Sequence, residues 1–372
     1  MACYRNAEKN DYCEFIDLSN YVFGVDFEKV LPKTFNKNFD FEKITKVAED
    51  KNGKLVAAVC VLPQQLTVGN FCLKANFLGG VAVHPRYRGE NHMITLINMW
   101  LDEIKGSCDI SVLGGLRQRY EYFGYTPGGV QLEYLINIHN IKHALKDTES
   151  ADISIKPLAE ADGGFEFAAK FNNNKNVNVH RDVENTDKIM VCYRQHPFGV
   201  FENGNIIGYF TTSLNREEIS EFVLCSNKDT KRVLKAYFEF FKIEKITVTV
   251  PEYETELNRE LSDFAEEYKI AFNCNYNIFN FANVIRAYLE LKNKSGRLSC
   301  GRFSAVMGGQ PVTVTVDVNG VLVENKADED AFVMDKMEAQ RLLLTNAGRY
   351  MDIDVPNDWF PLPLFWYRVD QF

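Results

Sequence analysis

The chain has 372 residues, which is enough for two or three domains. Its composition, 46% hydrophobic and 25% charged, is typical of globular proteins, and charges interrupt every long apolar stretch before it reaches membrane-spanning length. The net charge of −9 disfavours nucleic-acid binding, because phosphate contacts need a basic face.

The N-terminus and the cysteines both predict a cytoplasmic protein. Residues 1–17 carry charges of both signs and no apolar run, so we expect no signal peptide. Nine cysteines are scattered singly, without a C-x-x-C pair, and their number is odd. This pattern is typical of reduced, mostly buried thiols.

The first part of the chain predicts a strand-rich region after an opening of helices and loops over residues 1–50. Residues 54–62 form an apolar strand, and residues 64–68 and 71–73 flank the hairpin turn Gly69-Asn70. The second strand leads into residues 77–83. Gly79 and Gly80 inside that run indicate a bulge or a close backbone approach.

The stretch from Pro85 to residue 105 predicts an anion site. Pro85 ends the strand, and Arg86, Arg88 and Gly89 precede a helix with one apolar face over residues 90–105. The first helical N–H groups have no internal partner, and the helix dipole adds positive potential there. A glycine lets the backbone approach a phosphate closely, and the arginines add charge.

Further strands and helices alternate up to residue 250. We expect strands at 109–113 and 131–138 with a short helix at 117–123 between them, which predicts an α/β sheet. Composition turns polar near residues 146–151, where we place a boundary. A strand at 153–158, a hairpin at 199–210, a strand at 219–225, a helix at 228–241 and a strand at 245–250 then repeat the same order loosely.

A third unit is predicted from about residue 283. Strands at 312–317 and 321–324 flank the turn Asn319-Gly320. Asp335 and Glu338 form a capping-box pattern for a helix that ends before Gly348. The aromatic tail, residues 359–372, should dock onto the protein rather than fray.

The stretch around Pro85 resembles the acyl-CoA signature of the GNAT N-acetyltransferases. Its matching residues are Val81, Val83, Pro85, Arg88 and Gly89, and Asn91 and Met93 stand in two slots where the pattern has small residues. The resemblance implies acetyl-CoA as co-substrate, bound by Val81, Ala82, Val83, Arg88, Gly89, Glu90, Asn91, His92 and Met93. The second copy has neither Arg-x-x-Gly nor proline after Cys225, so we expect it to bind no CoA.

The whole order resembles the Eis family of N-acetyltransferases. That resemblance implies an α/β (α+β) fold with two tandem GNAT-like mixed-sheet domains and a sterol-carrier-like domain. The expected units are a catalytic domain at 1–147, a degenerate copy at 148–284 and the C-terminal domain at 285–372. It also implies a homo-oligomer, trimeric or hexameric.

The Eis resemblance assigns catalytic roles. It implies that the terminal carboxylate of Phe372 is the base and that Tyr125 is the acid. The general GNAT pattern points to Tyr120 instead, so we prefer Tyr125 and hold Tyr120 as the alternative. In such a fold, residues 1–50 form one wall of the acceptor pocket, with Phe23 and Asp26 as candidates to bind the amine. The alternative is that the aromatic residues are core and Asp26 caps a helix. Gly115 and Gln371 depart from the family pattern. The family's aminoglycoside substrates are therefore not assigned to this protein on the resemblance.

The chemistry of acetyl transfer fits these residues. A backbone N–H at Val81 or Ala82 could stabilise the oxyanion. A free α-carboxylate has a pKa of about 3.3–3.7, and an apolar pocket would raise it toward that of a useful base. His84 and His92 are alternative bases, whereas His139 and His143 have no partner that would make a metal site.

Two functions therefore stand beside each other. The first is N-acetyl transfer to a primary amine, such as a polyamine, an aminoglycoside-like compound, an arylamine or lysine. The alternative is a non-enzymatic acyl-CoA sensor or lipid-binding module, motivated by Asn91 and Met93.

Overall fold

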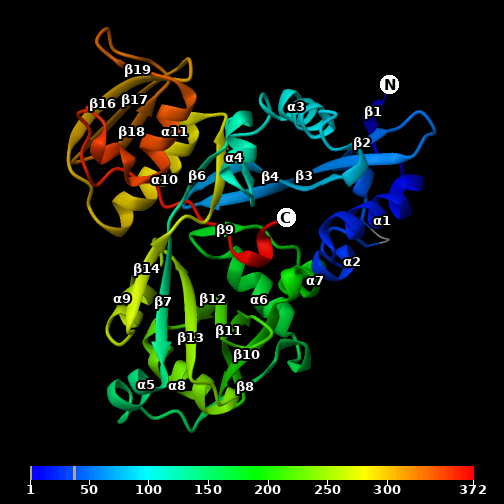
Figure 1. Ribbon diagram of the computed structural model, residues 1–372. Helices are drawn as coiled ribbons and strands as arrows, with labels where there is room; N and C mark the ends of the chain where they lie inside the picture. Colours follow the sequence, from blue (N-terminus) through cyan, green and yellow to red (C-terminus); the bar gives the residue numbers. More distant parts are fainter. Residues whose placement is uncertain (1, 37–38) are drawn as a thin grey trace.

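The computed structural model describes residues 2–36 and 39–372 and arranges them around three sheets. Figure 1 shows an upper lobe at the right, a lower lobe, and a third lobe at the upper left. This mixed α/β architecture confirms the predicted fold class.

The first sheet has eight strands and is built on one long hairpin. Its path follows β1 (Cys3–Asn6), β2 (Thr45–Glu49), β3 (Leu55–Val68), β4 (Phe71–Val83), β5 (Ile110–Leu113), β15 (Cys274–Ile278) and β6 (Thr126–Gly128), and β9 (Val177–Val179) pairs with β3. The hairpin turn at Gly69-Asn70 is confirmed, but the two strands expected before it form one continuous strand, β3.

Helices cover both faces of this sheet. The helices α1 (Tyr12–Phe23) and α2 (Phe27–Val30) pack on one face, against Ala58 and Phe77. The helices α3 (His92–Ile104) and α4 (Arg117–Tyr120) pack on the other, against Val59 and Leu78. Neighbouring strand residues point to opposite faces, so each strand contributes to both layers.

The second sheet has seven strands, in the order β14 (Glu267–Ala271), β7 (Gln131–Asn137), β13 (Lys245–Pro251), β12 (Glu218–Leu224), β11 (Asn205–Thr212), β10 (His196–Glu202) and β8 (Ile153–Pro157). Its helices are α5 (Ile138–Ala144), α6 (Gly164–Asn173), α7 (Thr186–Met190), α8 (Thr230–Phe241) and α9 (Thr255–Ser262). The strands and the helix expected between residues 153 and 250 are confirmed.

The first two sheets exchange strands. The strand β7 precedes the expected boundary at 147/148, yet it pairs with β13 and β14 of the second sheet. Conversely, β15 lies within the expected second domain and pairs with β5 and β6 of the first sheet. This exchange of strands links the first and second lobes across the expected boundary at 147/148. The domain boundaries themselves stay predictions.

The third sheet has four strands, in the order β18 (Gly320–Glu324), β17 (Gln310–Asp317), β16 (Gly301–Met307) and β19 (Phe332–Met334). The helices α10 (Phe281–Ser295) and α11 (Lys336–Leu344) accompany it. The expected capping box is confirmed, because Asp335 and Glu338 each accept the other's backbone N–H, at 2.8 and 2.9 Å.

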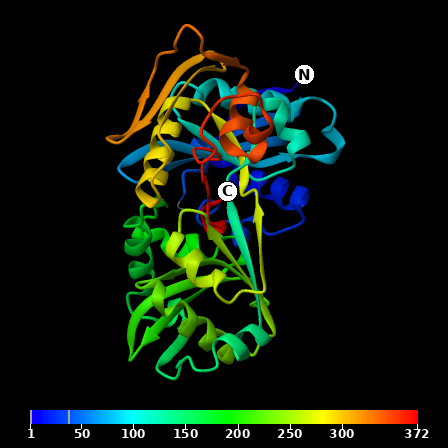
Figure 2. The same cartoon turned by 90° about the vertical axis from the view of Figure 1, so that its left-hand side faces the viewer.

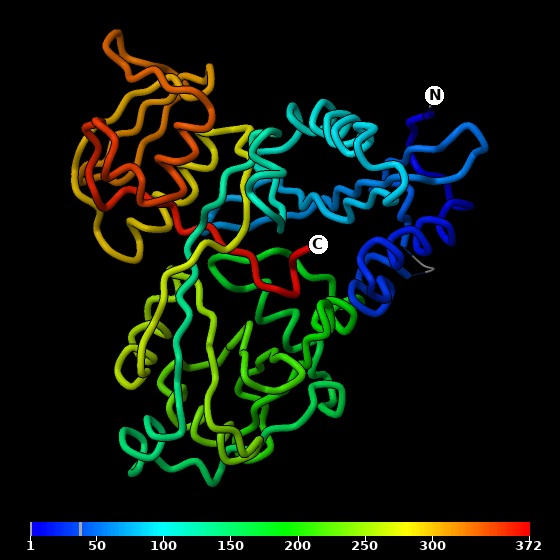
Figure 3. Tube along the Cα trace, viewed as in Figure 1, coloured from blue at the N-terminus to red at the C-terminus, as the bar shows by residue number. Residues whose placement is uncertain are grey.

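The aromatic tail docks as expected. In Figures 1 and 3 it leaves the third lobe and ends between the first two lobes, and the quarter turn of Figure 2 again places the C-terminus at the centre. Trp359, Trp366, Val369 and Phe372 are all buried. The last residue of the chain thus lies inside the molecule.

Two expectations from composition have different outcomes. All nine cysteines are free, but five are exposed, so the expectation of mostly buried thiols is wrong. The exposed cysteines are Cys3 on β1, Cys13 on α1, Cys72 near the start of β4, and Cys225 and Cys300 outside the helices and strands. No helix in the described ranges has the length and apolar character needed to cross a bilayer.

Candidate active site

A bulge in β4 opens the centre of the first sheet. Ala82 pairs with Ala58, but two residues further along β3 the partner of Cys60 is Gly79, so β4 holds the extra residue. Gly80 has φ +57°, and a Cβ there would lie 3.0 Å from the Cys60 sulfur. The bulge predicted from the two glycines is confirmed.

Beyond the bulge, β4 and β5 separate. Their parallel pairing runs from Ala75 to Phe77 on β4 and stops there in the described part of the chain. The edge from Val81 to Val83 is therefore open on the β5 side. An open strand edge can accept an extended chain as an additional strand.

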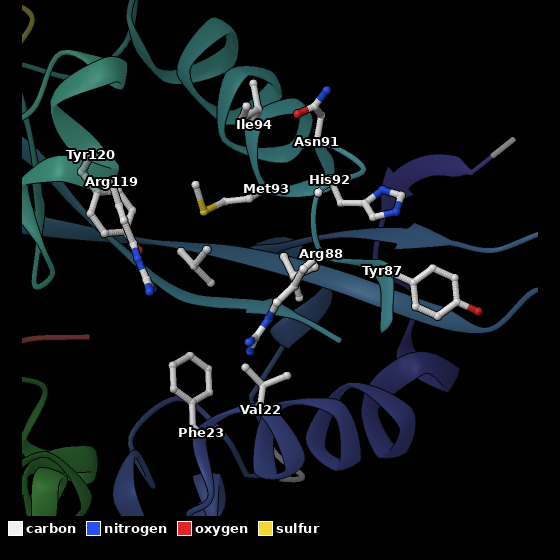
Figure 4. A pocket seen from close by; sticks show the side chains of 13 residues that line it. Val22, Phe23, Tyr87, Arg88, Asn91, His92, Met93, Ile94, Arg119 and Tyr120 are labelled. Carbon is white, nitrogen blue, oxygen red and sulfur yellow. The ribbon is translucent and has the colours of Figure 1, made fainter. Parts of the chain in front are cut away.

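A cavity of about 490 Å³ lies beside this edge and under the first turn of α3 (Figure 4). We call it the α3 cavity; its lining consists of Val22, Phe23, Val81, Val83, Tyr87, Arg88, Gly89, Asn91, His92, Met93, Ile94, Arg119 and Tyr120. Seven of the nine predicted cofactor residues are in this lining. Ala82 of β4 is fully buried and lies outside the lining. Glu90 is exposed, and its Oε2 lies 3.4 Å from the His92 Nε2.

The backbone at the start of α3 has the form that the motif requires. Gly89 has φ +87° and Asn91 has φ +63°, so Asn91 adopts the left-handed conformation usually taken by glycine. Asn and Asp tolerate this region better than other side chains do. The substitution of Asn91 for a small residue is therefore compatible with the turn.

The α3 cavity carries positive potential. The N–H groups of the first turn of α3 point out of the helix without intrahelical partners. Among the described residues, no carboxylate lies within ion-pair distance of Arg88 or Arg119. Figure 4 shows both guanidinium groups and the Met93 thioether extending into the cavity. The arrangement suits a phosphate-bearing ligand with an apolar portion.

The two histidines considered as bases, His84 and His92, are both engaged in contacts away from the bulge. The His84 Nδ1 accepts the backbone N–H of Arg86 at 3.3 Å, and its ring stacks on Tyr21. The His92 Nδ1 lies 2.9 Å from the Tyr4 hydroxyl, and Figure 4 shows its ring turned toward β1. Neither geometry directs an imidazole at the bulge.

A second cavity, of about 420 Å³, adjoins the α3 cavity and holds the end of the chain. We call it the Phe372 cavity; its lining consists of Phe23, Val25, Phe27, Val30, Leu31, Leu78, Gly79, Gly80, Val81, Gly114, Gly115, Leu116, Arg119, Tyr120, Tyr193 and Phe372. Phe23, Val81, Arg119 and Tyr120 line both cavities. The two spaces therefore meet beside the bulge.

The terminal carboxylate lies against the bulge itself. A Cβ on Gly79 would be 2.7 Å from a terminal oxygen of Phe372 and 2.9 Å from its carboxyl carbon. Only 6% of Phe372 is exposed, and its ring lies 5.6 Å from that of Phe35. The structure thus brings Phe372 next to the predicted cofactor edge, as the sequence analysis expects.

Gly79→Ala is expected to displace the terminal carboxylate. The added methyl group would clash with backbone atoms of Phe372, which cannot move aside as a flexible side chain does. We expect kcat to fall at least about tenfold and stability to fall by about 1–3 kcal/mol, as for other overpacked sites. Gly106→Ala is the matched control, because its Cβ would meet open space. Equal kcat for Gly79→Ala and wild type would contradict this role of the contact.

Two polar residues of the first lobe hold the tail by its backbone. The Lys33 ammonium donates to the carbonyls of Val369 and Gln371, at 2.8 and 2.6 Å. The Gln64 amide donates to the Asp370 carbonyl at 2.6 Å and accepts the Trp366 indole N–H at 2.9 Å. Burial lowers the pKa of Lys33. The sequence analysis does not identify either residue.

The second lobe holds the tail through a buried ion network. Arg181 donates to both carboxylate oxygens of Asp370, each at 2.8 Å, and to both of Glu221, at 3.0 and 3.1 Å. All three side chains are buried. The Tyr209 hydroxyl also donates to Glu221, at 2.8 Å. The tail is thus fixed two residues before its end, which orients the terminal carboxylate.

The two candidate tyrosines have different surroundings. Tyr125 is completely buried, its hydroxyl lies 2.7 Å from that of Ser111, and among the described residues it lines neither cavity. Tyr120 lines both cavities, and no described residue hydrogen-bonds its hydroxyl. Burial raises the pKa of both. The placement favours Tyr120, the alternative in the sequence analysis, over the preferred Tyr125.

Gly115 explains how Tyr120 reaches its position. A Cβ on Gly115 would lie 2.5 Å from the Tyr120 ring. The ring packs on the bare backbone at this point, so any side chain at position 115 would displace it. This packing signal is not readable from the sequence.

The two predicted amine-binding residues, Phe23 and Asp26, lie in different surroundings. Phe23 lines both cavities and is 44% exposed. Asp26 lines neither among the described residues; its carboxylate accepts the Lys29 backbone N–H at 3.2 Å and lies 2.9 Å from the Lys29 ammonium. Asp26 is the N-cap of α2, which is the alternative considered from the sequence.

Potential metal-ligating side chains are scattered over the described residues, 2–36 and 39–372. No group of three or more His, Cys, Asp or Glu side chains in these ranges could hold an ion. His139 and His143 both lie on α5.

Comparison with known proteins identifies the first lobe. Residues 3–128 match the family described as an acetyltransferase (GNAT) domain. A search of curated protein sequences finds no match. Residues 3–128 are therefore a GNAT acetyltransferase domain, and the chain carries an acyltransferase.

Solved structures share the fold of nearly the whole chain. A probable N-acyltransferase from Enterococcus faecalis is 17% identical, with a TM-score of 0.70, and the match covers 96% of this chain and 95% of that one. A GCN5-related N-acetyltransferase from Anabaena variabilis is 16% identical, with a TM-score of 0.68, and the match covers both chains fully. Eis1 from Mycobacterium abscessus is 12% identical, with a TM-score of 0.65, over 100% of this chain and 99% of that one. At these identities the likeness concerns the fold.

Proposed function

We propose that this protein is an acetyl-CoA-dependent N-acetyltransferase that acts on a primary amine. The observation that carries the proposal is the contact between the Phe372 carboxylate and the bulge at Gly79, in a cavity shared with Tyr120. A carboxylate, a tyrosine hydroxyl and an open strand edge beside an anion site are the groups that direct acetyl transfer needs.

The roles follow from the chemistry. The amine nitrogen forms a bond to the acetyl carbon while the thioester C–S bond breaks. The Phe372 carboxylate takes the proton that the amine loses, and its apolar surroundings favour this by raising the affinity for a proton. Tyr120 gives its hydroxyl proton to the leaving sulfur.

The residues around the α3 cavity fit acetyl-CoA as the acetyl donor. Arg88 and the first N–H groups of α3 would hold its pyrophosphate, and the open edge at Val81–Val83 would pair with its extended arm. The acetyl group would then lie at the bulge, where the two cavities meet.

The first experiment follows free thiol while the untagged protein is incubated with acetyl-CoA and a panel of amines. The proposal requires amine-dependent thiol release. If acetyl-CoA raises the melting temperature but no amine releases thiol, the acyl-CoA sensor replaces the enzyme as the better proposal.

Tyr120→Phe is expected to lower kcat by about 10²–10⁴-fold, the range for loss of a general acid, with little change in the KM for acetyl-CoA. Tyr125→Phe removes a buried hydroxyl and leaves Ser111 with one partner fewer, so we expect a loss of about 1–3 kcal/mol in stability with kcat retained. Initial rates and thermal unfolding of both variants separate the two effects. The opposite pattern would return the acid role to Tyr125.

The remaining expectations extend this proposal. The domain limits at 147/148 and 284/285, the sterol-carrier-like nature of residues 285–372, the cytoplasmic location and the trimeric or hexameric assembly rest on composition and on the Eis resemblance. The second copy is expected to bind no CoA. A size measurement in solution and a lipid-binding assay test the assembly and the third domain.

A further inference from the structure

We propose that the acceptor is a small apolar primary amine with a single positive charge, that is, an arylalkyl or alkyl monoamine. This inference rests on the proposed function and narrows it, because it separates monoamines from polyamines and aminoglycosides. The juxtaposition that carries it is one carboxylate at the end of an otherwise apolar cavity.

The walls of the Phe372 cavity are apolar over most of their extent. On the side of α1 and α2 they consist of aromatic and aliphatic side chains such as Phe27 and Leu31, and on the opposite side of Leu78 and Leu116. The glycines of β4 and of the segment after β5 add backbone without side chains. A volume of about 420 Å³ suits a small molecule.

The charges in this cavity are few. Among its described lining residues no side chain is acidic, so the terminal carboxylate of Phe372 is the single anion. Arg119 contributes a cation at the junction with the α3 cavity. Asp26 and Glu28 flank the lining residue Phe27, and both are already engaged, with the Lys29 ammonium at 2.9 Å and the Tyr12 hydroxyl at 2.7 Å. The cavity can therefore neutralise one ammonium group.

The residue before Phe372 adds no second anion. Gln371 is neutral, and its amide is engaged with the Arg368 guanidinium at 3.1 Å and the Trp366 carbonyl at 3.3 Å. A polyamine or aminoglycoside would bring further ammonium groups against apolar walls or Arg119. An unpaired charge in such surroundings is strongly unfavourable.

Hexylamine and 1,6-diaminohexane test this directly, because they share a six-carbon chain and differ by one terminal ammonium group. We expect kcat/KM for hexylamine to exceed that for the diamine by at least about tenfold, and phenethylamine to resemble hexylamine. Spermidine, an aminoglycoside and a lysine peptide complete the panel. A kcat/KM for any of these at or above that of hexylamine overturns the inference and leaves the acetyltransferase intact. No thiol release with any amine overturns both.

Leu116→Glu adds an anion to the same wall. Leu116 is 61% exposed, so the substitution changes the surface of the cavity and not the core. We expect the preference for hexylamine over the diamine to fall several-fold in L116E and to persist in L116Q, which has the same shape without the charge. Melting temperatures verify that both variants fold, and an unchanged preference in folded L116E overturns the charge argument.

Discussion

Adding residues after Phe372 is expected to abolish acetyl transfer while acetyl-CoA binding is retained. The extension converts the terminal carboxylate into a neutral amide and needs space beside Gly79, where the carboxyl group is already in contact. Loss of a general base costs about 10²–10⁴-fold in rate, so we expect a fall in kcat/KM of that size. The α3 cavity is formed by other residues, so acetyl-CoA should still raise the melting temperature.

Two further proteins isolate the carboxylate from its surroundings. A chain that ends in Phe372 carboxamide, made by ligating a synthetic tail, has the same shape without the charge. Deletion of Phe372 keeps a carboxylate but withdraws it by one residue, about 3.3–3.6 Å. Both should be as inactive as the extended chain, whereas the same extension at the N-terminus should be harmless. Full activity of the carboxamide would exclude the carboxylate as base.

The sequence predicts the cofactor side of the site well because its signals are local. Pro85, Gly89 and the periodic apolar face of residues 90–105 follow one another directly in the sequence, and the structure has the expected strand, turn and helix. Asn91 is an example, because it stands where the motif has a small residue, and it adopts the left-handed conformation that such a position requires. Helix caps such as Asp335 with Glu338 are equally local.

What the sequence does not predict depends on contacts between distant residues. The strand β7 carries an ordinary strand pattern, and nothing in that pattern specifies the lobe in which it pairs. The strand β15, Cys-Asn-Tyr-Asn-Ile, is not among the strands expected from the sequence. Tyr120 and Tyr125 stand in one short motif, and their roles separate only when the ring of Tyr120 is seen on Gly115. Arg181 and Asp370 are 189 residues apart, so neither indicates the other.

Arg181→Met is expected to be the most destabilising of the substitutions considered. Removing the guanidinium leaves the buried Asp370 carboxylate without its ion-pair partner. Among the described residues, the buried Glu221 carboxylate keeps Lys175 as its cation, at 3.7 Å, and the Tyr209 hydroxyl as a donor. Breaking a buried ion pair by removing one partner costs about 3–5 kcal/mol. Lys170→Met breaks the exposed pair with Glu166 and should cost less than about 1 kcal/mol, which makes it the matched control. Denaturant unfolding measures both.

The same substitution should also lower kcat in the folded protein, because Asp370 then no longer fixes the tail two residues before the carboxylate. Rates are best measured well below the melting temperature, so that unfolding does not contribute. Asp370→Asn should show the kinetic loss with a smaller loss of stability, since Arg181 keeps Glu221 as its partner.

The pH dependence of stability distinguishes this network from packing alone. Burial by itself would raise the pKa of Glu221, but Arg181 and Lys175 outweigh it and hold the pKa below its ordinary value of 4.5. A carboxylate with a lowered pKa stabilises the fold fully above about 4.5, and that contribution is lost as the pH falls through the folded value. In Arg181→Met, burial raises the pKa of Glu221 because the guanidinium no longer opposes it. Protonation of Glu221 at lower pH then removes the cost of burying its charge and reduces the destabilisation of the variant. The difference in unfolding free energy between wild type and Arg181→Met should therefore narrow between pH 7 and pH 4; a constant difference would mean that Arg181 acts through its shape rather than its charge.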